Sequence, residues 1–117
     1  MTREIFQPAV YILANGTRGT IYIGATSNLM QRLQQHREGL IEGFTRRYGI
    51  RRLVHFEMFD TIEAAIARER QLKEWRRTWK VELIERQNFH WDDLAVGLGF
   101  EPLPSREMDP GFRRDDG

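Results

Sequence analysis

The stretch AVYILANGTRGTIYIG, residues 9–24, decides the predicted fold. Two runs rich in β-branched and aromatic residues flank a centre of Asn, Gly and Thr, which is typical of a β-hairpin. The strands are predicted over 9–13 and 20–24. A turn centred on Gly16 and Thr17 places Tyr11 directly opposite Tyr22. Any register in which paired residue numbers have an odd sum keeps the two tyrosines on one face, because side chains alternate along a strand.

Downstream patterns add one more strand and several helices. Ser27 or Asn28 can cap a helix that Gly39 ends. The sequence Asp60-Thr61-Ile62-Glu63 has a capping-box pattern that marks the start of another helix. The predicted elements are a helix over 28–38, a strand over 53–59, helices over 61–75 and 78–87, and a short last turn at 91–94. Periodicity therefore predicts a small α+β domain.

Composition limits the kinds of protein that this chain can be. Its 117 residues fit one compact domain, expected over 1–100, and the aperiodic residues 101–117 are expected to form a flexible tail. The absence of cysteine excludes disulfides and thiolate metal sites. No apolar run reaches the roughly 20 residues of a membrane helix. We therefore expect no membrane partner and a cytoplasmic location, and no pattern indicates an oligomeric state.

Positive charge is concentrated in two stretches of the chain. Residues 18–52 hold seven arginines against two glutamates, and residues 68–80 hold six basic residues against two acidic ones, although the net charge is only +1. Such stretches favour a polyanionic partner, but arginine-rich solvated helix faces explain them equally well. The common nucleotide-binding and hydrolase motifs are missing, including G-x-G-x-x-G, the P-loop, H-E-x-x-H and G-x-S-x-G.

Glu69 interrupts the apolar stripe of the helix predicted over 61–75. The stripe consists of Ile62, Ala65, Ile66 and Leu72. A carboxylate among core-facing residues is unfavourable unless it is paired or binds a cation. Two interpretations are open: an ion pair at the edge of the stripe with Arg32, Lys73 or another base, or a catalytic or metal-binding role.

Several motifs, in their order along the chain, resemble the GIY-YIG nuclease superfamily and in particular its small stand-alone bacterial members. They are Val10-Tyr11-Ile12, Tyr22-Ile23-Gly24, and the segments 28–36, 43–48, 64–73 and 75–80. The resemblance covers about residues 8–95, and the first motif reads Ala-Val-Tyr in place of Gly-Ile-Tyr. It implies the GIY-YIG fold, an α+β fold with a β-β-α-β-α core and a small, mostly antiparallel three-stranded sheet flanked by helices.

The resemblance also implies an activity and the residues that perform it. The activity is hydrolysis of nucleic-acid phosphodiester bonds with one divalent cation, Mg²⁺ or Mn²⁺; the expected substrate is DNA, cut with low sequence specificity in repair or recombination. The implied catalytic residues are Tyr11, Tyr22, Arg32, His36 and Glu69, and Glu69 is also the implied metal ligand. We expect nucleic-acid contacts from Arg46, Arg47, Arg51, Lys73 and Asn88.

These residue types suit the chemistry. The planar guanidinium of Arg32 matches a phosphate, and a cation held by one carboxylate can polarise a phosphate oxygen. Tyr11, near Tyr22 or His36, can orient or deprotonate the attacking water, and the choice of base is open. The main alternative is a nucleic-acid-binding module with this fold and little activity alone. A structural or protein-interaction domain is a second alternative, and it would leave Glu69 unexplained.

Overall fold

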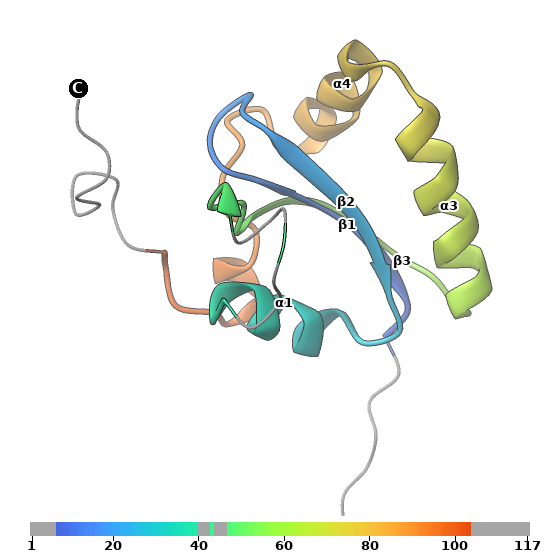
Figure 1. The fold of residues 1–117 in the computed structure, drawn as a ribbon, viewed down its shortest axis with the longest axis horizontal. Helices are drawn as coiled ribbons and strands as arrows, with labels where there is room; N and C mark the ends of the chain where they lie inside the picture. Colours follow the sequence, from blue (N-terminus) through green and yellow to red (C-terminus); the bar gives the residue numbers. More distant parts are fainter. Residues whose placement is uncertain (1–6, 40–42, 44–46, 104–117) are drawn as a thin grey trace, which may run out of the picture.

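The computed structural model describes residues 7–39, 43 and 47–103, which form an α+β fold around a three-stranded sheet (Figure 1). Its elements are β1 (Ala9–Ala14), β2 (Ile21–Thr26), α1 (Leu29–Arg37), β3 (Arg52–Met58), α3 (Ile62–Glu74), α4 (Arg77–Gln87) and a 3-10 helix (Val96–Leu98). Both strand pairs are antiparallel, and β1 lies between β2 and β3. The predicted fold class and element order are confirmed. Residues 104–117 of the predicted tail lie outside the described residues.

The sheet has a hydrophobic core on each face, with α1 on one side and α3 and α4 on the other (Figure 1). The core toward α3 and α4 includes Val10, Ile12, Leu72, Leu83, Ile84 and Trp91. The core toward α1 includes Tyr11, Leu13, Leu29, Leu33, Leu53 and Ala95. All residues of β1 are buried, because the central strand is covered on both faces. In the described part of the chain, no helix has the length and apolar character needed to cross a membrane.

The hairpin register differs from the predicted one. Tyr11 pairs with Gly24, and Tyr22 pairs with Leu13. The prediction that the two tyrosines lie directly opposite each other is therefore wrong, because the turn is centred one residue later along the chain. They still share one face of the sheet, since the paired residue numbers keep an odd sum.

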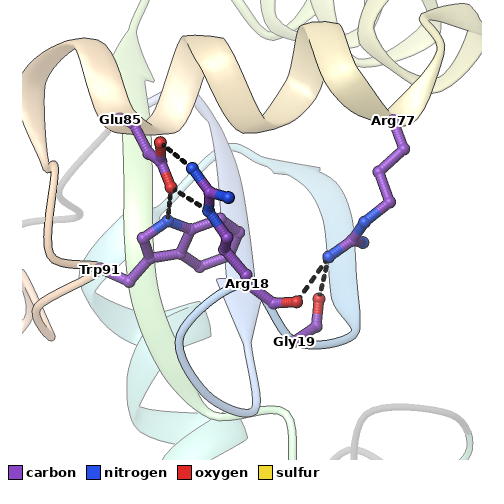
Figure 2. A network of polar contacts seen from close by, with 5 residues as sticks. All are labelled: Arg18, Gly19, Arg77, Glu85 and Trp91. Atoms are coloured by element: carbon purple, nitrogen blue, oxygen red, sulfur yellow. Dashed lines mark hydrogen bonds and ion pairs between the residues drawn. The ribbon is translucent and has the colours of Figure 1, made fainter.

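Contacts with α4 hold the turn in this register (Figure 2). Arg18 has a left-handed φ of 54°, which is uncommon for a residue other than glycine. Its Nε donates to Glu85 Oε2 at 2.7 Å, and the same carboxylate oxygen accepts from the indole of Trp91 at 2.7 Å. Near the start of α4, Arg77 donates to the backbone carbonyls of Arg18 and Gly19 at 2.7 and 2.8 Å. These bonds offset the unusual backbone conformation and fix the place where the hairpin turns.

Side-chain caps begin two of the helices that flank the sheet, α1 and α3. The Asn28 side chain accepts from Gln31 N at 3.1 Å, which confirms one of the two predicted caps of α1. Thr61 caps α3, because its hydroxyl accepts from Ala64 N at 3.1 Å. The capping box predicted from Asp60 is therefore wrong by one residue.

A bulge in β3 is held by the side chain of Asn88. The register of β1 against β3 shifts between Ile12 and Leu13, which leaves Val54 as the extra residue. Asn88 Nδ2 donates to Val54 O at 3.1 Å and to Asp92 O at 2.9 Å. Asn88 Oδ1 accepts from Asp92 N at 2.9 Å. The whole amide of this buried residue is therefore bonded to backbone.

The segment after α4 passes from one face of the sheet to the other, since Trp91 lies in one core and Ala95 in the other. The short last turn predicted at 91–94 is found later, as the 3-10 helix Val96–Leu98. The physical reason is the left-handed φ of 59° at Trp91, which a right-handed helical turn cannot contain.

Candidate functional site

Three predicted site residues meet in one hydrogen-bonded group on the α1 face of the sheet. The Tyr11 hydroxyl lies 3.2 Å from His36 Nε2, and Arg32 Nη1 donates to the same hydroxyl at 3.3 Å. Arg32 and His36 are one helical turn apart on α1, so both can reach the same strand residue. Tyr11 and His36 are 0% and 5% exposed. The central strand and one helix therefore form a preorganised polar group, which we call the Tyr11 triad (Tyr11, Arg32 and His36).

Tyr22 and Gly24 surround the Tyr11 ring. The Tyr22 ring centroid lies 6.3 Å from that of Tyr11 and 5.9 Å from that of His36. A Cβ atom added to Gly24 would lie 2.6 Å from the Tyr11 hydroxyl and 2.7 Å from its Cζ atom. Only glycine leaves room for the tyrosine ring at this pair. This role of Gly24 was not predicted from the sequence, although the glycine of the Tyr-Ile-Gly motif was its signal.

Burial moves the titrations of Tyr11 and His36 away from neutral pH. Burial raises the pKa of Tyr11 to about 12, although a hydrogen bond from Arg32 opposes the rise. Burial, followed by the charge of Arg32, lowers the pKa of His36 to about 4. At pH 7 the phenol is protonated and the imidazole is neutral, so the Tyr11 hydroxyl donates to His36 Nε2 and accepts from Arg32.

Glu69 lies on α3, which packs chiefly along the edge strand β2. Burial is the main cause of the raised pKa of Tyr11, and the negative charge of Glu69 makes a minor contribution to it. The Glu69 side chain is 19% exposed, and its Oε2 lies 2.8 Å from Nζ of Lys73, whose side chain is 51% exposed. The ion pair with Lys73 is therefore present. It does not exclude a functional role, because a half-exposed lysine can exchange the carboxylate for water or phosphate.

The donors near the Tyr11 triad fit a hard divalent cation. Among the described residues, no group of three or more His, Asp or Glu side chains is placed to hold a metal ion. Glu69 and the tyrosine hydroxyls are oxygen donors, which Mg²⁺ and Mn²⁺ prefer. Mg²⁺ bound to proteins often uses one or two carboxylates and keeps several waters. A single carboxylate at Glu69 is consistent with that mode of binding.

The arginines predicted to contact nucleic acid in the segment between α1 and β3 are described in part. Arg46 lies outside the described residues, whereas Arg47 and Arg51 are described and exposed. The Arg47 guanidinium lies 5.8 Å from the ring centroid of Tyr48, which is 50% exposed. Asn15 Nδ2 donates to Tyr48 O at 3.3 Å, so Tyr48 lies beside the hairpin turn. The structure therefore places an exposed aromatic ring beside Arg47, one of the arginines predicted to contact nucleic acid.

The two other residues predicted to contact nucleic acid differ in their access to solvent. Lys73 is exposed and paired with Glu69. Asn88 is 6% exposed, and both its amide nitrogen and its oxygen are bonded to backbone at the β3 bulge. We therefore assign Asn88 to the fold and no longer to the nucleic-acid surface, because a phosphate cannot reach its donors.

The lowered pKa of His36 predicts how stability changes with pH. Its folded value of about 4 lies below the ordinary 6.5, so the unfolded chain binds the proton first as pH falls. The contribution of His36 is complete above pH 6.5 and is lost on acidification toward pH 4. Relative to His36→Gln, the wild type should lose stability with a limiting slope of about 1.4 kcal/mol per pH unit. Urea unfolding of both proteins from pH 7.5 to 4 measures this, and parallel curves would contradict it.

Comparison with known sequences defines the class of this protein. The sequence pattern of the GIY-YIG catalytic domain matches residues 7–82, which is more than half of the chain. The protein belongs to the GIY-YIG family, and membership implies nuclease-type activity.

Several relatives carry the name UPF0213 protein. One from Syntrophus aciditrophicus is 38% identical over 77 residues, which cover 65% of this chain and 87% of that protein. Another from Haloquadratum walsbyi is 38% identical over 66 residues, which cover 56% of this chain and 74% of that protein. The solution NMR structure of a UPF0213 protein from Bacillus halodurans is 27% identical, with a TM-score of 0.48, and the match covers 81% of this chain and 99% of that one.

Proposed function

We propose that this protein is a metal-dependent endonuclease that hydrolyses phosphodiester bonds of DNA with low sequence specificity. The observation that carries the proposal is the hydrogen-bonded Tyr11 triad. A buried phenol bonded to both a cation and a neutral imidazole is a polar arrangement that packing alone does not require. Family membership supports the nuclease-type activity, and the contacts support the choice of residues.

Tyr11 orients the attacking water in this proposal. Its hydroxyl donates to His36 and accepts from Arg32, and one acceptor position remains for a proton of the water. With a pKa of about 12, the phenol keeps its own proton at neutral pH, so it acts as a positioning group in the resting site. His36 holds the phenol in place. Orienting the water contributes to the rate, because the water is then already held in a geometry from which it can attack the phosphate.

Arg32 and Glu69 provide the charges that a phosphate requires. One Arg32 donor is used by Tyr11, and the remaining fork of N–H groups can bind two oxygens of a phosphate. A divalent cation, when bound, supplies Lewis-acid polarisation of a phosphate oxygen. Glu69 would hold this cation. Lys73, released from its ion pair with Glu69, would contact a neighbouring phosphate.

The loop beside the hairpin turn binds the flanking backbone of the substrate. Arg47 and Arg51 are exposed there, and phosphate contacts of this kind carry no sequence information. We therefore expect these contacts to bind DNA with low sequence specificity. Tyr48 adds an exposed ring next to Arg47.

A plasmid-nicking assay tests the proposal. Purified protein should convert supercoiled plasmid into open circles with Mg²⁺ or Mn²⁺, and EDTA should stop the reaction. An RNA of similar length, tested in parallel, separates a DNA nuclease from an RNA nuclease. If the protein binds DNA or RNA but cleaves neither with Mg²⁺ or Mn²⁺, the result would favour a nucleic-acid-binding module and contradict the proposal.

Gly24→Ala should inactivate the site through packing alone. The added methyl group has to displace the Tyr11 ring, which breaks the contacts of the Tyr11 triad. We expect a nicking rate at least about tenfold lower and a loss of about 1–3 kcal/mol in stability, as for other overpacked cores. Gly16→Ala is the matched control, because nothing lies within 4 Å of a Cβ at Gly16. Wild-type nicking by Gly24→Ala would mean that the position of Tyr11 is not needed.

A further inference from the structure

The corner between α3 and α4 carries an aromatic and basic surface that the proposed site does not use. Trp75 and Trp79 meet edge to face with ring centroids 5.9 Å apart. The Arg68 guanidinium lies 5.3 Å from the Trp75 ring centroid, and that of Arg76 lies 5.0 Å from the Trp79 ring centroid. We call these four residues the tryptophan corner. The two rings contact each other, and each has one guanidinium over it; the Arg68 guanidinium is also paired with Glu57 at 2.9 Å, so Arg76 is the cation left for a ligand.

The two tryptophans differ in what the fold requires of them. Trp75 is half-buried and packs against the core between the sheet and α3. Trp79 is 48% exposed, and the buried side chains of α4 are Leu83 and Ile84 instead. The core therefore explains Trp75 and leaves Trp79 as a large aromatic side chain at the surface.

The charge around Trp79 indicates the kind of partner. Residues 68–80 hold six basic side chains against two acidic ones, and Arg70, Lys73, Arg76 and Arg77 among them are exposed. An exposed ring among arginines and lysines suits an unpaired nucleotide, whose base stacks on the ring while its phosphate meets the cations. A base pair within a duplex is stacked on its neighbours on both sides, so it has no free face for the ring.

We propose that the tryptophan corner is a second nucleic-acid contact, which stacks an unpaired base of single-stranded DNA or RNA on Trp79. Arg76, now over the ring, moves to the adjoining phosphate when a base takes its place. α3 ends five residues after Glu69, about 8 Å along the helix axis, and the corner begins there. The consequence of this contact rests on the proposed nuclease function. As a nuclease, the protein would prefer substrates with an unpaired segment over blunt duplexes.

Binding measured without catalysis tests this contact. Fluorescence anisotropy of a labelled oligo-dT, in EDTA, should show about tenfold weaker binding by Trp79→Ala, whereas Trp79→Phe keeps most of the affinity because it keeps a stacking ring. The affinity for a blunt duplex of two annealed DNA strands should fall less than threefold with Trp79→Ala. Phe89→Ala is the matched control, because Phe89 is 68% exposed and contacts the ring of His90 rather than an arginine. It should bind oligo-dT as the wild type does.

The possible outcomes separate the contact from the catalytic proposal. Equal weakening of oligo-dT and oligo-U by Trp79→Ala supports a contact with unpaired bases of either nucleic acid, and weakening of one alone supports it for that acid. Unchanged affinity of Trp79→Ala, or equal weakening by Phe89→Ala, overturns the contact even if plasmid is nicked. The contact is also overturned if sedimentation shows that the wild type is a dimer and that Trp79→Ala is a monomer, because the corner is then a protein interface. Trp79-dependent binding without any nicking supports the contact and removes the proposed nuclease function.

Discussion

Glu69→Gln should lose at least about a hundredfold in cation-dependent nicking while the protein stays folded. The substitution keeps the volume of the side chain and removes the charge that would hold the cation. It also removes the ion pair with Lys73, but the lysine side chain is 51% exposed and returns to water. A pair of this kind contributes only about 0–1 kcal/mol, so we expect the melting temperature to change little or to rise slightly.

Melting curves and the nicking assay on the same preparation decide the role of Glu69. A structural partner of a buried cation would instead cost about 3–5 kcal/mol when its charge is removed. Glu74→Gln is the matched control, because Glu74 is exposed and ends the same helix. It should nick at the wild-type rate. A Glu69→Gln protein that melts far earlier yet still cleaves with Mg²⁺ would contradict the assignment.

Tyr11→Phe should reduce the nicking rate by about 10²–10⁴-fold, the range found for positioned groups that handle the protons of a reaction. The ring stays in its place between Gly24 and Tyr22, so the loss reports the hydroxyl alone. Stability should fall by about 1 kcal/mol, because His36 and Arg32 each lose one hydrogen-bond partner.

Single-turnover nicking and DNA binding, measured together, distinguish a chemical role from a binding role for Tyr11. The affinity of Tyr11→Phe for DNA should stay within about threefold of the wild type, since a buried hydroxyl adds little contact with the backbone. Tyr48→Phe is the matched control, because it removes a hydroxyl from an exposed tyrosine and keeps the ring beside Arg47. Nicking by Tyr11→Phe within threefold of the wild type would contradict the role given to the phenol.

Local sequence was sufficient for the three strands and for the helices α1, α3 and α4, but not for the last turn. The two hairpin strands are rich in β-branched and aromatic residues, and Asn28 is a strong capping residue in front of an amphipathic segment. These elements formed within two residues of where they were expected. The shared face of Tyr11 and Tyr22 also followed, because it depends only on whether the register sum is odd. Capping at Thr61 in place of Asp60 shows the limit, since both residue types can cap and the choice depends on where the strand before them ends.

The candidate site was only partly visible in the sequence. Tyr11, Arg32 and His36 could be named from their motifs, but their meeting depends on how α1 lies across β1, and no local pattern encodes that. Asn88 also matched a motif position, yet the bulge in β3 takes both ends of its amide. A buried polar group forms hydrogen bonds with the backbone groups that lie nearest to it, and only the tertiary structure determines which groups those are.

The sequence by itself determined the strands, the helices and the common face of the two tyrosines, because these follow from periods of 2.0 and 3.6 residues. Tertiary structure decided the pairing of Tyr11 with Gly24, since the turn is set by Glu85 and Arg77 of α4 acting on Arg18. It also decided the protonation of the site, because burial and not residue type moves the pKa of Tyr11 to about 12. Both outcomes depend on interactions between groups that are far apart in the chain, and these interactions form only when the chain folds.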